Sequence, residues 1–245
     1  QERQERVALL QQEFDQVATR LAAMAEELGS SKDHRGIFTN LYNITTQSGV
    51  QEVQRLVDAG KWREAEFLGS LCVDFANRYF DAYDAYTQGP VENVPEAWRN
   101  AFDLGRQAQD TGILQGSVTK VLGLSIVAHI INDLPQTLQH IGYPEAEDRD
   151  TVLRETYDFF DAALMDQKEK IMHALASNYG VSDTLILDKV AEQLPFDVNS
   201  TGQKGLFSLM RDTARTRAET LSQEQIKAKA IATGDWVRRL VPGLS

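Results

Sequence analysis

Two histidines and several amide and carboxyl side chains lie within the most apolar stretch of the sequence, residues 113–141 (ILQGSVTKVLGLSIVAHIINDLPQTLQHI). On a helix, at about 100° per residue, His129, Asp133, Gln136 and His140 fall within roughly 60° of one another. An imidazole and a carboxylate spaced i, i+4 can bind one cation together, or they can bond each other so that the carboxylate fixes the imidazole tautomer. Since an unpartnered buried polar group costs on the order of 1–3 kcal/mol, this stripe indicates a functional site.

Pro135 makes the same helix irregular, because it has no N–H to donate to the carbonyl of Ile131. The helix is therefore expected either to kink, or to break and restart with Pro135 in its first turn. Both alternatives free backbone polar groups beside Asn132 and Asp133 for a ligand or water. His140 lies in the last turn, where a histidine commonly caps carbonyls or favours the helix dipole, so we assign it a structural role, most simply as a cap.

A second group of carboxylates follows one face of the helix predicted over residues 62–86. Asp74, Asp81 and Asp84 share that face. Asp74 and Asp81 have apolar neighbours and are expected to be partly buried, whereas Asp84, near the helix end, is expected to be solvated. Asp81 is therefore the predicted third ligand for a cation bound by the His–Asp pair.

The composition restricts the classes of function. The chain has 245 residues, of which 42% are hydrophobic, and a net charge of −11. Such an acidic protein is not expected to bind nucleic acid or to dock on an anionic membrane surface. The single cysteine, Cys72, lies in an apolar segment and excludes an internal disulfide or a cysteine-rich zinc site. Lys120 and the polar stripe interrupt the longest apolar run, so no transmembrane helix is expected.

The periodicity of apolar residues predicts an all-α fold, a single-domain multi-helix bundle over residues 1–245. No stretch alternates as several strands would. An N-terminal amphipathic helix over 1–28 is expected to end at Gly29, and Asp33 is expected to cap the next helix, which fades near Gly49. Further helices are expected over 50–59, 62–86, a short segment carrying Trp98, 113–141, 151–179, and, among C-terminal helices within 182–240, 182–193 and 206–233.

Four segments resemble a known family. The run VAHIINDLPQTL resembles the signature of the family called domain of unknown function 5995, and GIFTNLYNITT, FANRYFDAY and AWRNAF resemble three of its other segments in the same order. The likeness spans roughly residues 35–179, and Val127 and Ile131 depart from the signature. The polar positions that match are Tyr42, Asp81, His129, Asn132 and Asp133. The family implies no established activity.

A more distant likeness is to the helical zinc-dependent phospholipases C and related single-strand nucleases. These enzymes use a His-x3-Asp pattern, which His129 and Asp133 reproduce without the glycine that usually precedes the aspartate. They also need more histidines than the four present here. The likeness therefore implies one metal ion at most.

The leading expectation is a metal-dependent enzyme, most simply a hydrolase, in which His129, Asp133 and Asp81 hold one divalent ion, zinc, manganese or iron, that activates a water. Asn132 and Tyr42 would either support the metal ligands or orient the substrate. One alternative is a metal-free biosynthetic enzyme, such as a cyclase or tailoring catalyst, that uses the His–Asp pair as acid and base in an aromatic pocket. The other is a non-catalytic binding or scaffold protein whose stripe is an internal hydrogen-bond network.

A small-molecule substrate is the expected partner, and assembly as a homodimer is left open. The expected location is the cytoplasm, with the alternative that an export signal precedes Gln1 and is removed.

Overall fold

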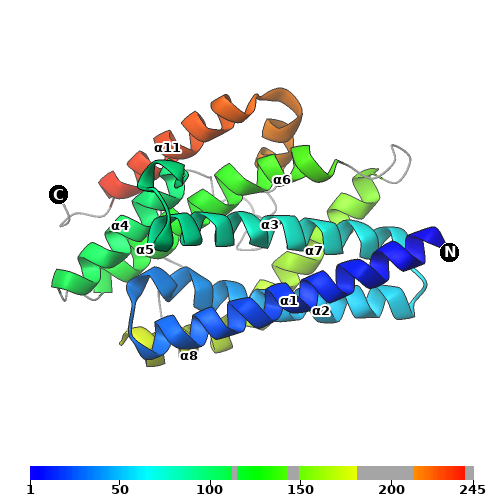
Figure 1. The fold of residues 1–245 in the computed structure, drawn as a ribbon, viewed down its shortest axis with the longest axis horizontal. Coiled ribbons are helices and arrows are strands. Elements are labelled where there is room, and N and C mark those ends of the chain that lie inside the picture. The colour runs from blue at the N-terminus through cyan, green and yellow to red at the C-terminus, as the bar shows by residue number, and fades with distance from the viewer. Residues whose placement is uncertain (112–114, 143–148, 181–211, 241–245) are drawn as a thin grey trace.

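Helix α3 (Trp62–Gln88) lies in the middle of a helical bundle, between α1 (Glu2–Ser30) and α2 (Ile37–Asp58) on one side and α6 (Leu134–Ile141) and α11 (Gln223–Leu240) on the other (Figure 1). The computed structural model describes residues 1–111, 115–142, 149–180 and 212–240, and this part of the chain is all-α without a strand, as predicted. The other elements are η1 (His34–Gly36), η2 (Val91–Asn93), α4 (Glu96–Thr111), α5 (Gln115–Ile126), η3 (Val127–Asp133), α7 (Arg149–Asp166), α8 (Lys168–Tyr179) and a helical stretch over 212–220.

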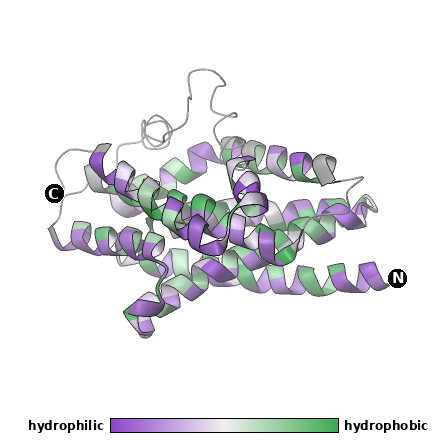
Figure 2. Cartoon of the chain, turned by 90° about the horizontal axis from the view of Figure 1, so that it is seen from above, coloured by the Kyte–Doolittle hydropathy of each residue, from purple (hydrophilic) through white to green (hydrophobic). Residues whose placement is uncertain are grey.

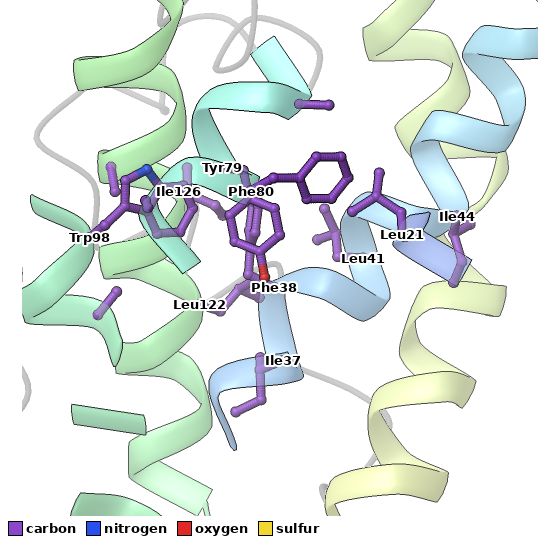
Figure 3. Packing of buried hydrophobic residues seen from close by; sticks show 14 of the residues in the cluster. Leu21, Ile37, Phe38, Leu41, Ile44, Tyr79, Phe80, Trp98, Leu122 and Ile126 are labelled. Carbon is purple, nitrogen blue, oxygen red and sulfur yellow. The ribbon is translucent and has the colours of Figure 1, made fainter. Parts of the chain in front are cut away.

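The long helices are amphipathic and bury their apolar faces against one another, so that hydrophobic residues gather in the middle of the bundle (Figure 2). In α1 the buried residues recur every three or four positions, as the sequence predicts. Phe38 of α2 lies near the centre of the core, with the rings of Tyr79 at 5.5 Å and Trp98 at 5.4 Å between centroids (Figure 3). Aromatic packing thus joins α2, α3 and α4 beside the central helix, which is the continuous run of α5, η3 and α6.

Two helix ends predicted at glycines are wrong. Helix α1 continues through Gly29, and α2 runs as one helix through Gly49 where two were expected. A Cβ at Gly29 would lie 2.6 Å from Nδ2 of Asn178, and one at Gly49 would lie 3.0 Å from Cζ of Phe14. These glycines therefore allow close helix packing, which a pattern within one helix does not reveal.

Two long helices expected in the second half are each divided. The helix predicted over 151–179 consists of α7 and α8, which meet at Gln167, and the one predicted over 206–233 is interrupted at residues 221–222. Ser222 and Gln225 form a reciprocal capping box there, each side chain accepting the other's backbone N–H, and this begins α11. The predicted helix over 182–193 lies outside the described residues. Asp33, predicted to cap the second helix, caps instead η1, the short helix that leads directly into α2.

The central helix contains a π-helical turn between α5 and α6. The N–H of Leu134 donates to the carbonyl of His129, five residues earlier, and Pro135 is the second residue of α6. Pro135 has no N–H to donate, and the π turn η3 accommodates this change in the hydrogen-bond pattern. The helix therefore continues from α5 into α6 and does not begin again with a side-chain cap. By length and composition Val118–Ile141 could cross a membrane, but 94% of its apolar window is buried inside the fold, as in a core helix.

We expect Gly36→Ala to lower the free energy of unfolding by about 1–3 kcal/mol. A Cβ there would overlap Leu28 and lie 2.8 Å from the hydroxyl of Tyr179. The matched control is Gly69→Ala, whose Cβ would meet Leu10 at an ordinary 3.5 Å, and which is expected to raise stability by up to about 1 kcal/mol through helix propensity. Urea denaturation measures both, and equal effects would contradict the packing role of Gly36.

Candidate functional site

His129 lies buried in the π turn, and its two ring nitrogens have different surroundings. Nδ1 lies 3.4 Å from Oδ2 of Asp133, whereas Nε2 is buried and forms no hydrogen bond within the described part of the chain. The imidazole stacks on the ring of Phe75, with 3.4 Å between centroids and 11° between planes. The rings of Tyr42 and Phe38 approach it edge-on at 4.5 and 5.0 Å. Packing therefore fixes the ring and leaves Nε2 as its unused polar atom.

The carboxyl group of Asp133 is held by donors from two elements. Nε1 of Trp98, on α4, donates to Oδ2 at 2.7 Å, and Nδ2 of Asn132 donates to Oδ1 at 2.8 Å. The same Oδ2 faces Nδ1 of His129. A carboxylate in this position favours the imidazole tautomer with its proton on Nδ1, so that Nε2 carries the lone pair.

Burial controls the protonation of the side chains around this pair. It lowers the pKa of His129, and the opposing hydrogen bond and charge of Asp133 do not offset it, so the imidazole is neutral at pH 7. Burial also raises the pKa of Tyr42 well above its ordinary value, with smaller contributions from Cys72 and Asp133. The pKa of the Cys72 thiol is raised by burial alone. At neutral pH the tyrosine and cysteine therefore keep their protons, whereas the neutral imidazole of His129 has one ring nitrogen without a proton.

A cavity of about 100 Å³ lies beside the His129 ring, between α2, α3, the central helix and α7. Its walls are mainly aromatic and aliphatic, and its polar atoms belong to tyrosine, threonine, cysteine and His129. No Asp, Glu, Lys or Arg is among its described lining residues. An apolar cavity of about 150 Å³ can hold benzene. This cavity therefore suits a slightly smaller molecule, or one end of a larger one.

The structure brings together four of the five predicted site residues and leaves one apart. His129, Asp133, Asn132 and Tyr42 are neighbours. Asp81 is exposed rather than partly buried as predicted, because α3 turns Phe75 and Tyr79 toward the core, and Asp81 follows about 200° beyond Tyr79. Among the residues that the structure describes, no group of three His, Cys, Asp or Glu is placed to hold a metal. They do not fit the expected three-ligand cation site.

The polar stripe of the central helix divides into an inner and an outer part. Gln136 donates from Nε2 to the backbone carbonyl of Asn132 at 2.9 Å. His140 is exposed, and its Nδ1 lies 2.5 Å from Oδ1 of Asp74, whose other oxygen accepts from Arg78 at 2.9 Å. His140 does lie in the last turn of α6, as predicted, but its side chain pairs with α3 rather than with the carbonyls of its own helix. Asp74 is partly buried, as predicted.

The sequence pattern placed Trp98 on a short helix and did not indicate its role at the site. Trp98 is fully buried, and a buried indole N–H needs an acceptor. That need was a usable signal, but nothing in the local pattern says that the acceptor is Asp133, 35 residues away. Phe75, which stacks on His129, is another aromatic residue whose role at the site the sequence pattern did not indicate.

Comparison with known proteins identifies a family but no activity. No curated protein and no solved structure matches the chain. The family described as "Family of unknown function (DUF5995)" matches residues 14–239, a longer region than the 35–179 expected from the motifs, and one that includes the whole site. The chain therefore belongs to this family, DUF5995.

Proposed function

We propose that this protein is an enzyme that transfers a proton on a small molecule held in the cavity beside His129. One observation carries the proposal: Nε2 of a neutral, buried imidazole has no hydrogen-bond partner among the residues that the structure describes, and its ring borders an apolar cavity. Leaving such an atom unpartnered costs on the order of 1–3 kcal/mol. Unsatisfied groups of this kind concentrate at functional sites.

In the proposed reaction Nε2 takes a proton from the bound molecule, and Asp133 holds the Nδ1 proton and stabilises the imidazolium that forms. Trp98 and Asn132 keep the carboxyl group in place, and Phe75 keeps the ring in plane. The Nδ1–Oδ2 distance of 3.4 Å is long for a hydrogen bond. Such bonds are often long without substrate and shorten when it binds.

Specific contacts favour proton transfer by His129 over the other two expected functions. A metal-dependent hydrolase lacks its third ligand, because Asp81 is exposed. A purely structural network would account for Asp133 and Asn132, but it offers no reason for a cavity beside an unpartnered nitrogen. Nucleophilic catalysis by Cys72 is disfavoured because its thiol stays protonated and forms no bond to His129.

The proposal is tested on the free protein by ¹⁵N NMR of the imidazoles. We expect His129 at pH 7 to be neutral with its proton on Nδ1, and Asp133→Asn to shift it toward the Nε2-protonated form, since an amide can donate to Nδ1. Exposed His173 provides the reference, and its ¹⁵N signals should be the same in the wild-type protein and in Asp133→Asn. A wild-type His129 that carries its proton on Nε2 has no lone pair for the cavity, and that result would refute the role as base.

A further inference from the structure

Three neighbouring hydroxyl-bearing residues line the cavity on α2, and they differ in how their hydroxyls are used. Thr45 Oγ1 donates to the carbonyls of Leu41 at 3.3 Å and Tyr42 at 3.1 Å. The hydroxyls of Tyr42 and Thr46 form no hydrogen bond with any residue that the structure describes. The residues that line the cavity thus include two with unused O–H donors and His129, whose buried Nε2 has an unused lone pair.

The charges around the cavity select an uncharged molecule. Its described lining has no cation to pair with a carboxylate or phosphate, and Asp133, behind His129, makes the potential near Tyr42 more negative. An ammonium group would have to leave water for a described lining that has no aspartate or glutamate to balance its charge. Burying a charge without a partner is costly, so both kinds of ion are disfavoured.

We infer that the substrate is a compact, uncharged, mainly apolar carbonyl compound, a ketone or aldehyde. Its oxygen accepts hydrogen bonds from Tyr42 and Thr46, and a C–H next to its carbonyl faces Nε2 of His129. This inference rests on the proposed function, because it names the molecule on which the base acts. A carbonyl group with an adjacent C–H needs donors at its oxygen and a base at its carbon, and the cavity supplies these groups.

The step balances without a co-reactant. The C–H bond breaks, its proton goes to Nε2, and its electron pair forms the carbon–carbon double bond of an enolate while the carbonyl π pair moves to oxygen. The two hydroxyls stabilise the negative oxygen. The imidazolium then returns the proton to the same carbon, which exchanges it with solvent, or to another carbon, which moves a double bond within a conjugated substrate.

Binding is tested through Cys72, which is the single cysteine of the sequence and lines the cavity. The rate at which methyl methanethiosulfonate modifies it should fall when the cavity is filled. We expect cyclopentanone, a ring ketone whose carbonyl end can enter the cavity, to protect Cys72 at lower concentration than methylenecyclopentane, its hydrocarbon analogue. Cyclopropanecarboxylate and the pyrrolidinium ion should not protect it.

The variants locate the oxygen of the ketone. Tyr42→Phe and Thr46→Val should each raise the half-protecting concentration of cyclopentanone about 5- to 10-fold, as expected for loss of one hydrogen bond. Thr45→Val is the matched control and should change it little, because the Thr45 hydroxyl already donates to the backbone. Equal protection by ketone and hydrocarbon, or an equal effect of all three variants, would overturn the assignment of a carbonyl substrate.

Chemistry is tested by following hydrogen–deuterium exchange of cyclopentanone in D₂O by NMR. The wild-type protein should accelerate exchange next to the carbonyl, and His129→Gln should reduce the acceleration about 100-fold or more. Ketone-selective protection without His129-dependent exchange would overturn the proton transfer while keeping the ligand class. Exchange that depends on His129 but not on Tyr42 or Thr46 would overturn the placement of the oxygen while keeping the base.

Discussion

Asp133→Ala is expected to lower the free energy of unfolding by about 3–5 kcal/mol, the cost typical of removing one member of a buried charged network. The change leaves the indole N–H of Trp98 and the amide of Asn132 without acceptors, and it removes the carboxylate that faces Nδ1 of His129. Each buried donor left unpaired costs about 1–3 kcal/mol. Part of this cost is offset, because the variant no longer has to bury the carboxyl group of Asp133 away from water.

The matched control for this variant is Asp81→Ala. Asp81 is an exposed aspartate inside helix α3, so its removal should change stability by no more than about 0.5 kcal/mol. Urea denaturation of both variants, and of Trp98→Phe alone and combined with Asp133→Ala, measures the coupling between Trp98 and Asp133. A loss no larger than that of the control, or additive effects of the two changes, would contradict the network.

The protein is expected to become less stable as the pH falls below about 6.5, the ordinary pKa of histidine. Burial lowers the pKa of both His129 and His34, and nearby Asp133 and Asp33 oppose this shift only in part. Between the lowered pKa and the ordinary one, the unfolded chain binds the proton and the folded chain does not. In that window each histidine therefore lowers the free energy of unfolding by up to about 1.4 kcal/mol for each unit that the pH falls. Above the window neither state binds the proton, and the full stability is present.

Urea denaturation between pH 7.5 and pH 5.5 measures this slope. His129→Gln and His34→Gln should each flatten it, because each removes one proton-binding group whose pKa differs between the two states. A protein that gains stability as the pH falls through this range would show that the histidines are charged when folded.

The parts of the site that could be predicted from the sequence are those fixed by local geometry. His129, Asn132 and Asp133 meet because they lie within one turn of the same helix, and any helical arrangement keeps them close. The sequence pattern places Asp81 on the same face of its helix as Asp74, but local spacing does not tell which side of α3 is buried in the bundle. Its core face is set by packing with α1, α2 and α6.

The helices themselves follow from apolar periodicity, whereas several of their boundaries depend on contacts from elsewhere. Gly29 was expected to end a helix and instead admits the side chain of Asn178, nearly 150 residues later in the chain. The bond from Trp98 to Asp133 is also a contact between separate helices. Pro135 signalled an irregularity in the central helix, but whether a kink, a break or a π turn accommodates it depends on packing by α11 and α3.

The π turn also means that the site depends on the length of the chain as well as on residue types. A π turn equals an α-helix with one residue inserted. The inserted residue sets the direction in which every later side chain of the helix points. Loss of one residue between Val127 and Leu134 would restore α-helical phase and rotate α6 by about 100° relative to α5. Asp133 would then leave the side of the helix that meets Trp98, although every chemical group of the site would still be present. Relatives that keep these groups but lack that residue would thus not be expected to form the same site.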